Sequence, residues 1–282
     1  MTAPDRSDLV EDFVREIQAT RKYRHICEDT IRDVIQTALP RYKRTRDAVK
    51  TARTKLHRIQ AAYLGRYAIA EHLDAIRNAH RADDVDRLRT ICLRLMQDHA
   101  STRERIPLLD TFYRDVFDIA GPPRSILDVA CGMHPLAIPW MNLPAQAAYR
   151  AYEIAGDLVG CLNGFLEAIG VTGLGAGPPV RLQDVICTPP TEDADLAFLM
   201  KMVPCLERRQ KGIAVRLIDN LRVRHVVVSF PVRSLAGRSK HMPAFYARSF
   251  AKMTAARGWR LIEVPIEGEL VFVVDKGRAD PA

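Results

Sequence analysis

The chain changes its residue pattern at Gly121-Pro122-Pro123. Before this point, from residue 8 to about 120, apolar residues recur at three- and four-residue spacing and glycine is almost absent, which predicts consecutive helices. After it, short apolar and β-branched segments alternate with helical segments, which is typical of a sheet whose parallel strands are joined by helices. The sequence therefore predicts an α/β protein with an all-α N-terminal extension.

The expected sheet has a recognisable order of elements. Strands are expected at 125–130, 148–153, 180–184, 196–201 and 225–230, with a closing β-hairpin formed by 259–264 and 270–274. Helices are expected at 157–169, 207–220 and 245–257. Five strands with crossover helices followed by a β-hairpin are the sequence order of the Rossmann-like sheet of class I S-adenosylmethionine (SAM)-dependent methyltransferases. This likeness concerns the fold alone.

Composition limits the class of protein. A chain of 282 residues with 48% hydrophobic residues can bury a full globular core. The first eight residues contain no apolar run, and no uncharged stretch is long enough to span a bilayer, so we expect a soluble, cytoplasmic protein with no membrane partner. The six cysteines form no Cys-x-x-Cys pair, which predicts reduced thiols and no metal site.

Positive charge is concentrated in one segment. The formal net charge is +8, which favours a polyanionic partner. The basic residues between 41 and 66 are opposed only by Asp47, and they are Arg41, Lys43, Arg44, Arg46, Lys50, Arg53, Lys55, Arg58 and Arg66. Lys43, Arg44, Lys50, Arg53, Lys55 and Arg58 are the candidate RNA contacts in this run. A solvated helix face without a partner is the alternative interpretation.

The first candidate ligand site is the turn that follows the strand at 125–130. Asp128, Ala130 and Gly132 lie where a Rossmann-like sheet binds its ligand, at the carboxyl end of a strand, and a glycine there lets the backbone approach closely. A Gly-x-Gly-x-x-Gly motif is absent, which argues against NAD and favours the single-glycine turn of methyltransferases. An ordinary strand-to-helix turn is the alternative.

Two further acids end successive strands. Glu153 lies roughly 20 residues beyond the turn, where a carboxylate accepts from ribose hydroxyls, and Ile154 follows it. Asp184 can accept from an adenine amino group while Val185 packs on the ring. A single carboxylate at a strand end is more often solvated than bound to a ligand. Acids in register at the ends of successive strands are less easily explained by chance, so together they favour a ligand site.

The fourth strand leads into the place where methyltransferases build the pocket for the target base. Leu199 is a candidate cofactor contact, and Lys201 is a candidate for positioning the acceptor. Enzymes that methylate exocyclic amines carry Asn or Asp followed by two prolines and an aromatic there, and this motif is missing. A ring nitrogen such as guanine N7 is then the better candidate. It needs no proton removed, so we assign no general base.

Four segments resemble the aminoglycoside-resistance 16S rRNA (guanine-1405, N7) methyltransferases. They are HASTRER at 99–105, DVACGMHPLA at 128–137, LMKMVPCLE at 199–207 and SFPVRSLAGRSK at 229–240. The resemblance implies methylation of guanine 1405 in the decoding site of the assembled small ribosomal subunit, with SAM as donor and S-adenosylhomocysteine (SAH) as product. It also implies resistance to aminoglycosides that contain a 4,6-disubstituted deoxystreptamine, and a monomeric enzyme.

The resemblance also assigns roles to residues. It implies that Arg103 holds the methionine carboxylate of the cofactor, which suits a guanidinium fork. It implies that Arg233, Arg238 and Lys240 belong to a basic loop that faces the RNA, with Arg233 and Arg238 positioning the acceptor. Residues 1–100 match a helical extension that docks on folded rRNA, and 101–282 match the methyltransferase domain. The chain departs from the family at two positions, where Glu153 stands for an aspartate and His134 for an asparagine.

Two other functions fit part of this pattern. A methyltransferase acting on another position of the rRNA, such as an adenine N1, would have the same fold. A non-catalytic RNA-binding or ribosome-assembly protein with a Rossmann-like shell would have the same charge, although it would not need acids at the strand ends.

Overall fold

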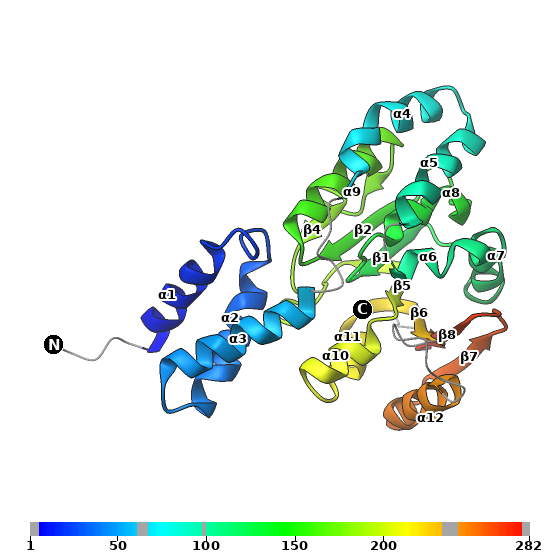
Figure 1. The fold of residues 1–282 in the computed structure, drawn as a ribbon. Helices are drawn as coiled ribbons and strands as arrows, with labels where there is room; N and C mark the ends of the chain where they lie inside the picture. The colour runs from blue at the N-terminus through cyan, green and yellow to red at the C-terminus, as the bar shows by residue number, and fades with distance from the viewer. Residues whose placement is uncertain (1–5, 61–66, 98–99, 233–241, 278–282) are drawn as a thin grey trace.

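The computed structural model describes residues 6–60, 67–97, 100–232 and 242–277 (Figure 1). A central sheet carries helices on both faces, and α1, α2 and α3 stand together at one side of it (Figure 1). Arg233, Arg238 and Lys240, which the sequence assigned to an RNA-facing loop, lie outside the described residues.

Helices α1 (Arg6–Gln18), α2 (Glu28–Ala38) and α3 (Thr45–Gln60) form a unit with its own hydrophobic core, and we call them the helical unit. Val14, Ile17, Ile31, Ile35 and Leu56 are buried in that core, as their helical spacing predicts. A short 3₁₀ turn at Leu39–Arg41 follows α2, because the proline in it has no N–H to continue the α-helix.

Helices α4 (Ile69–Arg81), α5 (Val85–Gln97) and α7 (Leu109–Ala120) belong to a different core. Ile76, Leu95 and Phe112 from these helices pack in the same cluster as the sheet residues Ile126 and Phe198. The hydrophobic cores therefore divide the chain between α3 and α4, whereas the sequence suggested a boundary at residue 100. The short helix α6 (Ala100–Arg103) connects α5 to α7 through a 3₁₀ turn at Ile106–Leu108.

The sheet has the strand order β3-β2-β1-β5-β6-β8-β7, and β4 also pairs with β2. Its strands are β1 (Ser125–Val129), β2 (Ala148–Glu153), β3 (Thr172–Gly173), β4 (Val180–Leu182), β5 (Asp193–Met200), β6 (Arg222–Pro231), β7 (Arg260–Val264) and β8 (Glu269–Asp275). All pairs are parallel except those of β8 with β6 and β7. The Rossmann-like sheet closed by an antiparallel hairpin is confirmed. The two-residue strand β3 was missed because its pattern is too short to detect.

The two faces of the sheet are covered by different helices. On one face, Ile126 packs with α4, α5, α7 and α9 (Gly156–Ala168). On the other, Leu127 packs with α10 (Val203–Arg209), α11 (Ile213–Asn220) and α12 (Met242–Thr254). The short helix α8 (Ile138–Met141) lies after the β1 turn.

The single helix expected at 207–220 is wrong, because the structure has two helices there. Gln210 is extended, and Gly212 takes a left-handed conformation with φ of 74°. The Glu207 carboxylate then accepts from the backbone N–H groups of Gly212 and Ala214, so it caps the start of α11. A glycine in the middle of a helical pattern was the available signal for this break.

Candidate cofactor site at the carboxyl ends of the strands

The carboxyl ends of β1, β2 and β5 lie next to one another, because β1 pairs in parallel with both neighbours. Ala130 follows β1 with a φ of 55°, and Lys201 follows β5 with a φ of 58°. The described residues contain four non-glycine residues with positive φ, and these two are in turns at adjacent strand ends. Backbone strain of this kind is concentrated at ligand sites. Hydrogen bonds from Cys131 N to Tyr152 O and from Lys201 N to Ser229 O hold the two turns.

Glu153 links the turn after β1 to the turn after β2. Its Oε2 accepts from Gly132 N at 3.0 Å, and its Oε1 accepts from Ile154 N at 2.7 Å and Ala155 N at 3.0 Å. The carboxylate is buried, and burial raises the pKa of Glu153 above its ordinary value despite these three donors. Three of roughly four lone-pair positions are thus occupied within the described residues, which leaves one for a ligand.

Asp128 lies beneath the glycine turn rather than in it. Its Oδ2 accepts from the hydroxyl of Tyr149 and from His134 Nδ1 at 2.8 Å. Because a carboxylate only accepts, His134 Nδ1 donates to Asp128, and His134 Nε2 forms a hydrogen bond of 2.9 Å with the Tyr113 hydroxyl. Asp128 Oδ1 has no hydrogen-bond partner among the described residues. His134, which replaces an asparagine in the resemblance, is therefore part of a buried network that supports the turn.

Asp184 joins the sheet to the helical unit. Its Oδ2 accepts from Thr30 Oγ1 and from Arg209 Nη1, each at 2.6 Å, and its Oδ1 accepts from Ile186 N at 3.0 Å. Val185, the expected packing partner of a ligand ring, is buried beside it. Sequence reasoning missed Arg209 and Thr30, since neither belongs to a motif.

Arg103 ends α6 with its side chain exposed, and its Nη1 donates to Gln97 O at 3.5 Å. The next residue, Glu104, forms an ion pair of 2.6 Å with Lys201, so the Arg103 segment lies at the carboxyl end of β5. Leu199 in β5 is buried in the hydrophobic cluster between the sheet and helices α10, α11 and α12. An exposed guanidinium near the strand ends fits a ligand carboxylate.

A buried ion pair anchors the same segment. Arg105 donates two hydrogen bonds to Glu269 at 2.6 Å and 3.2 Å, and both side chains are at most 3% exposed. Burial alone would raise the pKa of Glu269, but the Arg105 and Lys201 charges outweigh it and the pKa lies below its ordinary value. No local pattern predicts this pair, because the two residues lie 164 positions apart.

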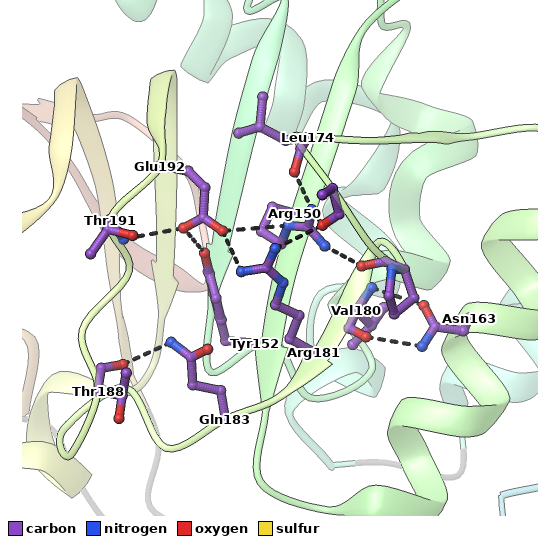
Figure 2. A network of polar contacts seen from close by, with 12 residues as sticks. Arg150, Tyr152, Asn163, Leu174, Val180, Arg181, Gln183, Thr188, Thr191 and Glu192 are labelled. Carbon is purple, nitrogen blue, oxygen red and sulfur yellow. Dashed lines mark hydrogen bonds and ion pairs between the residues drawn. The ribbon is translucent and has the colours of Figure 1, made fainter.

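A second polar network joins β2 to β4 and to the loop before β4 (Figure 2). Arg150 of β2 is fully buried and donates to the backbone carbonyls of Leu174, Ala176 and Pro178. In Figure 2, dashed lines join the Glu192 carboxylate to Tyr152 and to Arg181, and the Arg181–Glu192 ion pair measures 2.7 Å. These contacts hold the loop before β4 against β2. They therefore help to position Asp184, which follows β4.

The basic residues of the helical unit lie mostly at its surface. Lys43, Arg44, Lys50 and Arg58 are exposed, whereas Arg53 and Lys55 are half-buried. Arg53 pairs with Glu16 at 2.8 Å, so one of the candidate RNA contacts already has an acidic partner.

Across the described ranges, no group of three or more His, Cys, Asp or Glu side chains could hold a metal ion. No helix in that same part of the chain is long and apolar enough to cross a membrane.

Comparison with known proteins identifies the family. The family model described as "Ribosomal RNA methyltransferase (FmrO)" matches residues 19–273. The chain belongs to this family. A protein of Micromonospora rosea named 16S rRNA (guanine(1405)-N(7))-methyltransferase is 34% identical over 98% of this chain and its own full length. A protein of the same name from Serratia marcescens is 36% identical over 95% of this chain and 98% of its own.

Solved structures agree with the assignment to the FmrO family. The crystal structure of the 16S rRNA methyltransferase RmtF in complex with SAH has a TM-score of 0.78 and 30% identity, over 95% of this chain and 98% of that one. The structure of the 16S rRNA methylase RmtB has a TM-score of 0.74 and 32% identity. The family, the fold class and the class of enzyme that the sequence predicted, a SAM-dependent methyltransferase, are confirmed.

The donor set of this FmrO family member fits SAM. The Glu153 and Asp184 carboxylates each keep one lone-pair position free of bonds among the described residues, on the two strand ends where a nucleoside is bound in this fold. Ala130 and Gly132 give a turn in which no bulky side chain separates the backbone from a ligand. Arg103 is an exposed cation near the same strand ends, which is the chemistry that a ligand carboxylate requires.

Proposed function

We propose that this chain methylates N7 of guanine 1405 in 16S rRNA, with SAM as the methyl donor. The observation that carries the proposal is the extent of the similarity, since relatives with this printed activity match the helical unit as well as the sheet. The missing amine-binding motif after β5 supports a ring nitrogen as the acceptor.

The residues at the strand ends divide the work of holding the cofactor. Arg103 binds the methionine carboxylate, and a charged fork–carboxylate contact is among the stronger hydrogen bonds in proteins. Glu153 accepts from the ribose hydroxyls and Asp184 from the adenine amino group, each through its remaining lone pair. Asp128, Ala130, Gly132, Ile154, Val185 and Leu199 shape the turns and the apolar walls around them.

The transfer step needs position rather than proton chemistry. Bound SAM supplies an electrophilic methyl group on its sulfonium. The N7 lone pair forms the new N–C bond while the C–S bond breaks with its electron pair remaining on sulfur, which leaves SAH and a positively charged N7-methylguanine. No proton moves, so the chain needs no general base. Lys201, together with Arg233 and Arg238, orients the guanine for in-line attack.

The helical unit brings the site to its substrate. Lys43, Arg44, Lys50, Arg53, Lys55 and Arg58, together with Lys240, contact rRNA phosphates on the assembled small subunit. The enzyme acts as a monomer in the cytoplasm, where ribosomal subunits are. Methylation of the decoding site then prevents binding of aminoglycosides with a 4,6-disubstituted deoxystreptamine.

Mapping the methylated nucleotide tests the proposal. Purified small subunits and protein-free 16S rRNA are incubated with the protein and SAM, and the products are examined by primer extension and mass spectrometry. The expected result is an N7-methylguanine at 1405 in the assembled subunit. A methyl group at another position, such as an adenine N1, or no methyl group where a verified relative works, contradicts the proposal.

A further inference from the structure

The start of α2 lies against both turns that carry the candidate cofactor acids. Cys27 N donates to Ile154 O at 2.8 Å, and Gly156 N donates to His25 O at 2.7 Å, so residues 25–27 pair with the turn after β2. A Cβ on Gly156 would lie 2.9 Å from His25 O, closer than real Cβ contacts. The helical unit therefore fits tightly against the sheet at this point.

The second contact is made by side chains around Asp184. Thr30, the third residue of α2, is fully buried and donates its hydroxyl to Asp184 Oδ2. Arg209 of α10 donates to the same oxygen. These two bonds use both lone pairs of Oδ2, and Ile186 N uses one of Oδ1. Within the described residues, only the second lone pair of Oδ1 remains, and it has a fixed direction.

Arg209 is held from its other side as well. Its Nε and Nη2 donate to Asp33 Oδ2 at 3.1 Å and 2.7 Å, while Nη1 donates to Asp184. Because the guanidinium is rigid and planar, fixing one edge on α2 fixes the direction of the other edge. The carboxylate of Asp184 is thus oriented jointly by the helical unit and by α10.

We infer that Arg209 and Thr30 are positioning residues that give the site its selectivity for the adenine 6-amino group. The inference rests on the proposed function, in which Asp184 accepts from that group. The two residues saturate Oδ2 and leave one lone pair of Oδ1 for the ligand. Asp184 can then accept from a 6-amino group, whereas a 6-oxo group is itself an acceptor, offers Asp184 no donor and is rejected. The helical unit, through Thr30 and Asp33, is then part of the cofactor site.

The test compares two ligands that differ at this group. The full-length protein is titrated calorimetrically with SAH and with S-inosylhomocysteine, which carries a 6-oxo group. We expect the wild type to prefer SAH by roughly a hundredfold, because a buried site built for a donor rejects an analogue that lacks it. In Arg209→Met the preference should fall to roughly tenfold or less, since the charged bond that orients Asp184 is lost. Thr30→Val should lower it by a smaller factor, and Thr30→Ser should restore it.

Arg208→Met is the matched control. Arg208 is the neighbouring arginine on α10 and is exposed. It donates to Pro204 O and Cys205 Sγ, not to Asp184. The Arg208→Met variant should therefore prefer SAH over S-inosylhomocysteine as strongly as the wild type does. If Arg209→Met fails to fold, the nearly isosteric Thr30→Val carries the test. A wild type that binds both ligands equally, or variants that keep the full preference, overturn the inference. A folded wild type that does not bind SAH overturns the proposed function itself.

Discussion

The helical unit and the sheet use charge in opposite ways. In the helical unit, Lys43, Arg44 and Lys50 are exposed on and before α3. At the sheet, Arg105, which precedes the 3₁₀ turn at Ile106–Leu108, is buried together with Glu269 of β8. An exposed cation interacts weakly with its own protein but is available to a phosphate, whereas a buried pair determines where backbone segments lie. The exposed cations of the helical unit are therefore suited to binding, whereas the buried Arg105–Glu269 pair serves positioning.

The largest effect should come from breaking the buried pair. Arg105→Met leaves the Glu269 carboxylate buried without its main partner, so the free energy of unfolding should fall by about 3–5 kcal/mol. Urea denaturation measures this change. The matched control is Arg15→Met, since the Arg15–Asp12 pair has side chains 72% and 64% exposed and should contribute at most about 1 kcal/mol. Equal losses of unfolding free energy in the two variants would contradict the contrast between the buried and the exposed pair.

Removing exposed cations should affect RNA binding instead. The triple variant Lys43→Ala, Arg44→Ala, Lys50→Ala should bind small subunits roughly a hundredfold more weakly near 0.1 M salt, with a salt slope lower by about 2, because each phosphate contact contributes about 0.7–0.9. Its stability should remain close to that of the wild type.

A control triple of equal charge is available at the opposite end of the sheet. Arg222, Arg224 and Arg257 are exposed and lie at or before the amino ends of β6 and β7. Their replacement by alanine should leave the salt slope unchanged. Unchanged subunit affinity in the Lys43, Arg44, Lys50 variant would contradict the docking role of the helical unit.

Arg103 tests an exposed charge that lies in the sheet region. Arg103→Ala should weaken SAH binding roughly tenfold or more in calorimetry, because a hydrogen bond to a charged group is lost, while thermal stability changes little. Arg103→Lys should restore part of the affinity, since it keeps the charge but not the fork. Wild-type affinity for SAH in the Arg103→Ala protein would show that Arg103 does not bind the cofactor.

The smallest expected effect is the pH dependence that Glu153 causes. Burial raises its pKa in the folded protein above the ordinary value of 4.5, so its contribution to stability is fully present below that pH and is lost as the pH rises through the folded pKa. Relative to the wild type, Glu153→Gln should therefore gain stability as the pH increases from 4.5 toward neutrality. Denaturation of both proteins across this range measures the difference, and a constant difference would contradict the assignment.

Local patterns predicted the elements well and the contacts between distant elements poorly. The strand at 148–153 and the turn through Gly132 were predictable because alternation and strand-end residues are local signals. The division between α3 and α4 was not, because α4 has the same periodicity whether it packs on α3 or on the sheet. The Thr30–Asp184 bond joins residues 154 positions apart, so no local pattern contains it. What the sequence missed is the set of positioning contacts behind the acids it found.

The Arg105–Glu269 pair also has a consequence for synthesis of the chain. Arg105 leaves the ribosome 164 residues before Glu269, and β8, which carries Glu269, inserts between β6 and β7. Until that strand is in place, Arg105 lacks the carboxylate with which it is buried in the folded protein. We therefore expect the segment around Arg105 to take its final position only after β8 has been synthesised and has paired with β6 and β7.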